Sequence, residues 1–155
     1  MHPTANSRAF IENLPLITLN ARRVMPGVRL LSRMDNNELK AEADQLIQEC
    51  RLPELLAAYP RWFIGGSYSY DLMCWRDLDV YVLDSRHDLK RCFDVAYELT
   101  HLLSAKKSRF TNNVGSEPNG LYWGIKLGDE RQGAWKLDVW FLDLSTGQKM
   151  IFETA

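Results

Sequence analysis

The sequence predicts an α/β (α+β) fold in which helices pack on one face of a mixed sheet. Segments with a helical period and segments with a period of two follow one another in the order helix, β, β, helix, β, β, β. The chain has 155 residues, which suffices for one compact core. We therefore expect a helical segment over residues 1–60 that packs on a core domain over residues 61–155.

Charge and hydropathy narrow the class of protein. The chain carries 19 Lys and Arg against 20 Asp and Glu, a net charge of −1. We therefore expect no broad binding to nucleic-acid phosphates, which requires many cationic contacts. No apolar run of the sequence approaches the roughly 18 residues of a membrane span, so we expect no membrane association and a cytoplasmic location.

The N-terminal part is expected to be helical. Prolines and a glycine divide residues 1–34 into short apolar groups, which predict a short helix or two. Asp35 followed by Glu38 is a capping-box pattern, and it predicts a helix over 36–50. Pro53 fits the first turn of a second, short helix.

The rest of the chain is expected to build the sheet. Runs rich in β-branched and aromatic residues predict strands at 61–64, 76–83, 107–114, 120–128 and 134–142. An amphipathic pattern predicts a helix over 87–104. Ser145 and Thr146 are candidate caps of a last helix near residue 148. The stop at Ala155 favours the interpretation that a C-terminal helical domain is missing.

Two acids on one strand form the first candidate site. Asp77 and Asp79 are two residues apart, so both side chains leave the same face of the predicted strand, about 7 Å apart. Leu78, Val80 and Val82 then face the core. Neighbouring carboxylates need a neutralising partner. We expect a metal ion rather than a lysine, and Mg²⁺ with its preference for oxygen ligands fits best.

A third acid follows the same alternation. On the strand predicted over 134–142, Asp138 projects from the face opposite the buried one, together with Lys136 and Trp140. If this strand lies beside the first, three carboxylates converge and could hold two metal ions that assist a phosphoryl displacement. Lys136 is a candidate phosphate contact and Trp140 a candidate for substrate stacking; surface placement is the alternative for Lys136, and simple packing for Trp140.

A small-residue turn precedes the two acids. Gly65-Gly66-Ser67 follows a predicted strand, and its size lets the backbone approach a phosphate whose oxygens meet N–H groups and the Ser67 hydroxyl. Taken alone, the turn could equally be an ordinary strand ending.

Other conspicuous side chains are interpreted as structural. Acids at strand ends or in loops are expected to cap or to be solvated, namely Asp71, Asp84 and Asp143. Tryptophans with apolar neighbours are expected in the core, namely Trp62, Trp123 and Trp135.

The combination resembles the signature of the DNA polymerase beta-like nucleotidyltransferase superfamily. Gly66-Ser67, nine intervening residues, Asp77-Leu78-Asp79-Val80 and a later Asp138 carry the resemblance, which covers residues 61–143. The small size and near-neutral charge look more like the small-substrate, antibiotic-modifying branches than the polymerases.

The resemblance implies a nucleotidyltransferase-like fold and a reaction. A nucleoside monophosphate, AMP from ATP by preference, would move to a hydroxyl of a small molecule or protein, with release of pyrophosphate. The resemblance assigns two Mg²⁺ ions and catalysis to Asp77, Asp79 and Asp138, and the triphosphate to Gly66 and Ser67.

Two alternatives stay open beside this expectation. One is a noncatalytic member of the same fold that acts as an antitoxin or regulatory module with a protein partner or as a homodimer. The other is a fragment that binds nucleotide without turnover because its acceptor site lay in a lost domain.

Overall fold

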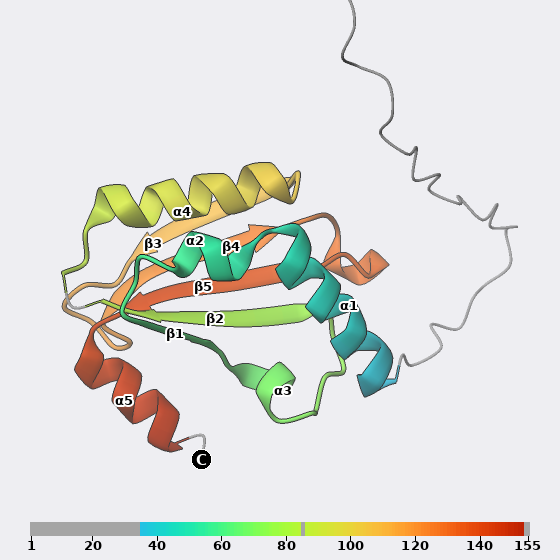
Figure 1. Cartoon of the computed structure of the whole chain (residues 1–155), viewed down its shortest axis with the longest axis horizontal. Coiled ribbons are helices and arrows are strands. Elements are labelled where there is room, and N and C mark those ends of the chain that lie inside the picture. Colours follow the sequence, from blue (N-terminus) through green and yellow to red (C-terminus); the bar gives the residue numbers. More distant parts are fainter. Residues whose placement is uncertain (1–34, 85, 154–155) are drawn as a thin grey trace, which may run out of the picture. The chain divides into compact units, whose positions relative to one another are not determined.

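Five strands form one mixed sheet in a computed structural model, which describes residues 35–84 and 86–153 (Figure 1). The strand order is β1-β2-β5-β4-β3. Their bounds are β1 (Arg61–Ile64), β2 (Asp77–Leu83), β3 (Lys107–Asn112), β4 (Gly120–Lys126) and β5 (Lys136–Leu142). β2 and β5 run parallel, and the other neighbouring pairs are antiparallel. The mixed sheet is confirmed, and the predicted strand ends are right to within two residues.

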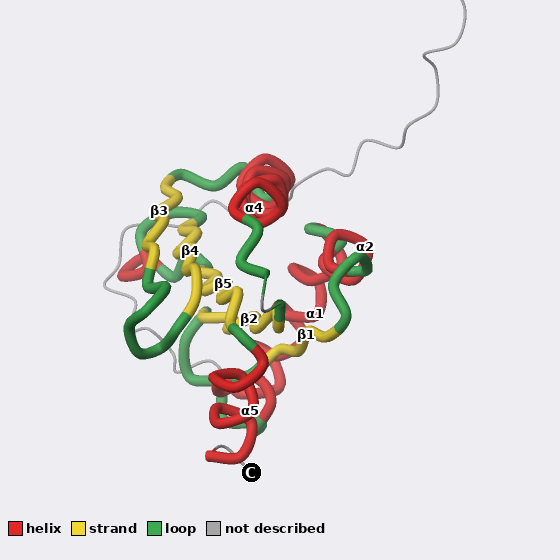
Figure 2. The backbone as a smooth tube through the Cα atoms, turned by 90° about the vertical axis from the view of Figure 1, so that its left-hand side faces the viewer, coloured by secondary structure: helices red, strands yellow, loops and turns green. Residues whose placement is uncertain are grey.

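The helices flank this sheet. They are α1 (Asn36–Glu49), α2 (Leu52–Leu56), α3 (Gly66–Ser69), α4 (Leu89–Leu102) and α5 (Leu144–Glu153), with a short 3-10 turn η1 (Glu130–Gln132). Viewed along the strands, α2 and α4 lie on one side of the sheet and α5 on the other (Figure 2). Among the described residues, no helix is long and apolar enough to cross a membrane. The short helices expected within residues 1–34 lie outside the described part.

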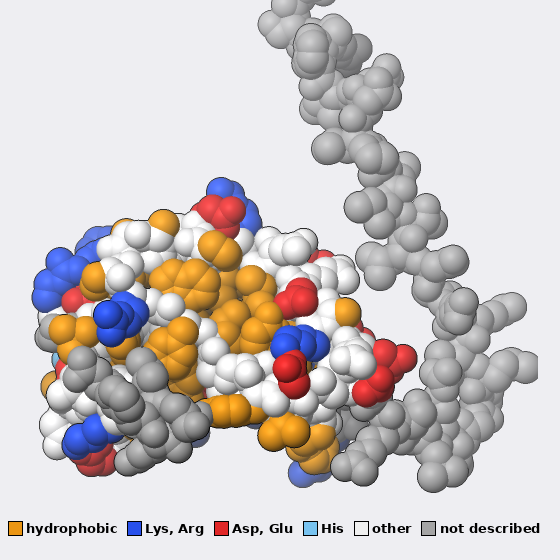
Figure 3. Space-filling model, turned by 60° about the horizontal axis from the view of Figure 1, so that its bottom comes forward, with side chains coloured by type: hydrophobic (Ala, Val, Ile, Leu, Met, Phe, Trp, Pro, Cys, Tyr) orange, Lys and Arg blue, Asp and Glu red, His pale blue; other side chains and the backbone are white. Residues whose placement is uncertain are grey.

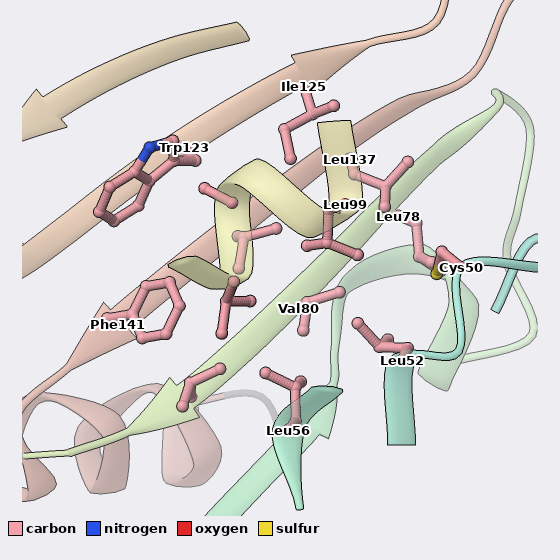
Figure 4. Packing of buried hydrophobic residues seen from close by; sticks show 14 of the residues in the cluster. Cys50, Leu52, Leu56, Leu78, Val80, Leu99, Trp123, Ile125, Leu137 and Phe141 are labelled. Atoms are coloured by element: carbon pink, nitrogen blue, oxygen red, sulfur yellow. The ribbon is translucent and has the colours of Figure 1, made fainter. Parts of the chain in front are cut away.

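The hydrophobic core lies between the sheet and α1, α2 and α4 (Figure 4). Alternate residues of the two central strands enter it, namely Leu78, Val80 and Val82 of β2 and Leu137, Val139 and Phe141 of β5. Each is at most 1% exposed, as the alternation predicted. Full burial of one such side chain contributes about 1.5–3 kcal/mol, so this face specifies the register of both strands.

α1 and α2 pack on the core. The backbone N–H of Asp35 donates to the Glu38 carboxylate at 3.4 Å, which is one half of the predicted capping box. Leu39 and Ala43 of α1 are buried in the core cluster. Arg76, just before β2, donates to Glu42 of α1 at 2.6 and 2.9 Å. These contacts position the start of β2.

The position of α5 corrects the expectation that helices pack on one face only. Gly147 of α5 is buried, and a side chain there would collide with Leu83. By strand alternation Leu83 lies on the same face of β2 as Asp77 and Asp79. α5 therefore covers one end of the face that carries the carboxylates.

The cap of α5 also differs from the prediction. The helix begins at Leu144 rather than near residue 148. Asp143 caps it, because its Oδ1 accepts the Thr146 N–H at 2.6 Å and the Ser145 hydroxyl at 2.7 Å. Ser145 and Thr146 are therefore partners of the cap rather than the cap itself.

The burial of one acid and of three tryptophans can be compared with the expectations from the sequence. Asp84 is 6% exposed rather than solvated, and the Arg86 side chain donates to it at 3.0 and 3.1 Å. Trp123 is in the core as predicted. Trp62 and Trp135 are only partly buried, but both pack against that core.

Candidate active site

The predicted convergence of acids is present in the register of β2 and β5. Adjacent strands of a sheet lie about 4.8 Å apart, and directly paired residues share a face. Across this parallel pair the matched residues are Asp77 with Lys136, Asp79 with Asp138, and Tyr81 with Trp140. All six are partly exposed, whereas their sequence neighbours in the core are buried. The two strands thus place three carboxylates and an ammonium group in one patch.

Lys136 pairs with two of these acids. Its Nζ lies 2.7 Å from Asp138 Oδ2 and 3.5 Å from Asp77 Oδ1. Burial opposes its charge, but the hydrogen bond to Asp138 and the nearby acids raise the pKa of Lys136 above its usual range. A lysine therefore neutralises part of the charge that we expected a metal ion to neutralise.

The acids retain unsatisfied charge. Burial, followed by the charges of Asp77 and Asp138, raises the pKa of Asp79 to about 6. Burial also raises the pKa of Asp77, although Lys136 opposes the shift. Asp77 Oδ1 is buried without a hydrogen bond in the described structure; its 3.5 Å approach to Lys136 is too long for one. The patch favours a further cation.

Tyr122 of β4 is a site residue that sequence reasoning missed. Its hydroxyl donates to Asp138 Oδ1 at 2.7 Å. Burial and this hydrogen bond raise the pKa of Tyr122 to about 12. Gly124, which is paired with Asp138, makes room, because a side chain there would collide with the Tyr122 hydroxyl. The alternation of β4 was visible in the sequence, but its pairing with β5 was not.

The glycine turn lies directly against the carboxylates. The Gly65 N–H donates to the Asp79 backbone oxygen at 2.9 Å. Gly66 has φ +60°, and a side chain at this position would collide with the Asp79 carboxylate. Glycine is therefore required at position 66 both by its backbone conformation and by the space available. Ser67 follows in α3 and is partly exposed.

An aromatic row crosses the sheet next to the acids. Phe63 stacks on Tyr81 with ring centroids 5.1 Å apart, and Tyr122 packs on Trp140 at 4.6 Å. Tyr81 and Trp140 are register partners, so the two pairs are neighbours. The sequence singled out Trp140 alone, because the row arises from four strands.

The donor set fits a hard divalent cation in its chemistry. It offers carboxylate oxygens, one of them buried without a hydrogen bond, as Mg²⁺ prefers. The arrangement differs from the chemistry, because within the described residues no group of three or more His, Cys, Asp or Glu is positioned to hold a metal ion. The Lys136 ammonium lies close to both Asp77 and Asp138.

Fold and site together define a mixed-sheet α/β protein with a carboxylate and lysine patch beside a glycine turn. No protein-family model matches the chain, and no curated protein matches it in sequence. The geometry of the site therefore carries the assignment of a function.

Proposed function

We propose that the protein is a metal-dependent nucleotidyltransferase that moves AMP from ATP to a hydroxyl of a small molecule or protein. The observation that carries the proposal is the contact between Gly66 and Asp79, together with the pairing of Asp79 and Asp138 on adjacent parallel strands. A turn suited to phosphate and a set of carboxylates suited to cations thus touch each other. A nucleoside triphosphate held there needs a cation between its oxygens and the acids.

Each residue takes a definite role in this reaction. The Gly66 backbone and the Ser67 hydroxyl bind triphosphate oxygens. Asp77, Asp79 and Asp138 would hold Mg²⁺, which would supply positive charge to neutralise the attacking and leaving oxygens. The acceptor oxygen bonds to the α-phosphorus as the bond to the β-phosphate oxygen breaks and pyrophosphate leaves. Asp138, with Tyr122 and Lys136 on its two oxygens, helps to remove the acceptor proton.

The aromatic row supports a place for the planar part of a substrate. Tyr81 and Trp140 lie two positions beyond Asp79 and Asp138, so the row borders the reacting atoms. Aromatic faces bind bases and other flat groups by stacking. We prefer ATP because it is the abundant nucleoside triphosphate. We expect the reaction, with ATP and Mg²⁺, to occur in the cytoplasm.

Calorimetry tests the proposal. We expect the full chain to bind a nonhydrolysable ATP analogue with Mg²⁺ and to lose this binding with a chelator. Asp77→Asn removes a ligand charge at constant volume, so it should abolish the metal-dependent part. Asp94→Asn is the matched control, because Asp94 is exposed on α4 and pairs with Lys90. Equal metal-dependent binding by Asp77→Asn and the control would contradict the proposal.

A noncatalytic, partner-binding role is the second candidate. Lys136 already pairs with two of the acids, as in a site that needs no metal. The loop before β2 exposes Leu72 (69%) and Trp75 (76%). Figure 3 shows hydrophobic side chains gathered on the side of the molecule where α3 and α5 lie in Figure 1. A pure partner-binding module should show no metal-dependent affinity for nucleotide.

A further inference from the structure

Lys136 lies between two of the three carboxylates of the patch. Its Nζ bridges Asp138 Oδ2 at 2.7 Å and Asp77 Oδ1 at 3.5 Å. The bridge is built in by the sheet, because Lys136 is the register partner of Asp77 and is two positions before Asp138 on the same face. The Lys136 side chain is 22% exposed and that of Asp138 14%, so solvent screens this pair only in part.

The neighbouring lysine shows that this arrangement is specific. Lys126 is the register partner of Lys136 on β4 and shares its face. Its Nζ pairs with Glu130 of η1, and in the part of the chain that the structure describes no ion pair joins it to the three acids of the patch. Two lysines are thus adjacent on one face, and only Lys136 contacts the carboxylates of β2 and β5.

The net charge of the patch indicates how many divalent ions are needed to neutralise it. Three carboxylates and one ammonium leave two negative charges, which one divalent cation neutralises. In two-metal sites the ions lie about 3.5–4 Å apart. A second divalent ion between Asp77 and Asp138 would have to displace the ammonium or lie against it, and like charges at such separations repel by several kcal/mol at about ε 20.

We infer that the chain itself binds one divalent ion, and that the Lys136 ammonium takes the place of the second. This inference deepens the proposed function and rests on it. Lys136 is then a positioning residue that keeps Asp77 and Asp138 directed at a shared cation. One divalent ion and the Lys136 ammonium together replace the two-ion arrangement that the sequence resemblance implied.

Counting bound Mn²⁺ by electron paramagnetic resonance tests the inference. Free aqueous Mn²⁺ gives a signal that decreases on binding, so a titration of the full, nucleotide-free chain yields ions per chain. We expect one ion for the unchanged protein, for Lys136→Arg and for the matched control Lys126→Met. We expect two ions for Lys136→Met, with the first bound at least about tenfold more tightly because a repelling charge is gone.

The outcomes separate this inference from the proposed function. Two ions in the unchanged protein, or a single ion in Lys136→Met at any affinity, would overturn the inference and leave the proposed function in place. No Mn²⁺ bound, either alone or with a nonhydrolysable ATP analogue, would overturn both. Far-UV circular dichroism verifies folding, and Lys136→Gln serves if the methionine variant does not fold.

Discussion

The two faces of the β2 and β5 pair differ in almost every physical respect although they are built from alternate residues of the same strands. One face packs Leu78 and Leu137 at 0% exposure against the helices. The other places Asp79 beside Asp138, and burial and like charge raise the pKa of Asp79 to about 6. The core face therefore supplies stability, and part of that stability is lost on the carboxylate face, where like charges are held together.

The largest expected effect lies on the carboxylate face. Asp79→Asn should reduce nucleotidyl transfer by more than about a hundredfold, because loss of a metal ligand costs more than the 10–100-fold of outer-shell changes. Transfer of label from α-³²P-ATP measures it. Asp94→Asn on α4 should retain activity. Metal-dependent transfer by Asp79→Asn at the level of this control would remove the functional difference between the faces.

The core face should respond in stability instead. Leu137→Ala truncates a fully buried side chain one residue from Asp138, and should lower the free energy of unfolding by about 2–5 kcal/mol. Urea unfolding measures the change. The folded fraction should still bind Mn²⁺, because no carboxylate is altered. A loss below about 1 kcal/mol would mean that the two faces do not divide stability and chemistry as described.

The carboxylate face should also make the stability of the chain depend on pH. The folded chain holds the Asp79 proton more tightly than an ordinary Asp of pKa 3.8 does, since the folded pKa is about 6. The stability from this protonated carboxyl is fully present below about pH 4 and is lost as the pH rises through about 6.

Asp79→Asn lacks this titration. We therefore compare the free energies of unfolding of the variant and the unchanged protein in the presence of a chelator. Between pH 4 and 7 the difference should shift in favour of the variant by about 1–2 kcal/mol, after allowance for solvent screening. Urea unfolding across this pH range measures the difference. A difference that is constant with pH would show that folding does not raise the pKa of Asp79.

The smallest expected effect concerns Tyr122. Tyr122→Phe removes one donor to Asp138 but leaves Lys136 on the other oxygen. We expect a loss of about 1 kcal/mol in the free energy of unfolding, typical of one hydrogen bond, measured by urea. Tyr97→Phe is the control, since Tyr97 is exposed on α4. Equal effects of both changes would show that the hydroxyl does not support the site.

The sequence predicted which face of its strand each acid occupies, but it did not predict every contact between neighbouring strands. Alternation alone placed Asp77, Asp79 and Asp138 opposite the core, because a period of two is a local property. The hydroxyl of Tyr122 on Asp138 depends on which strands pair and in which register, and these are properties of the whole sheet. The same limit explains why the bridge of Lys136 and the position of α5 were not predicted.

The parallel pairing of β2 and β5 also has a consequence for folding kinetics. Parallel neighbours need a crossover, and here α4, β3 and β4 all lie between the two strands in the chain. Closing such a long loop is slow and comes at an entropic cost before any contact repays it. The patch therefore forms only after β5 has docked, so a nascent chain that ends before β5 has Asp77 and Asp79 but no completed site. Cation binding would then report the docking of β5 beside β2.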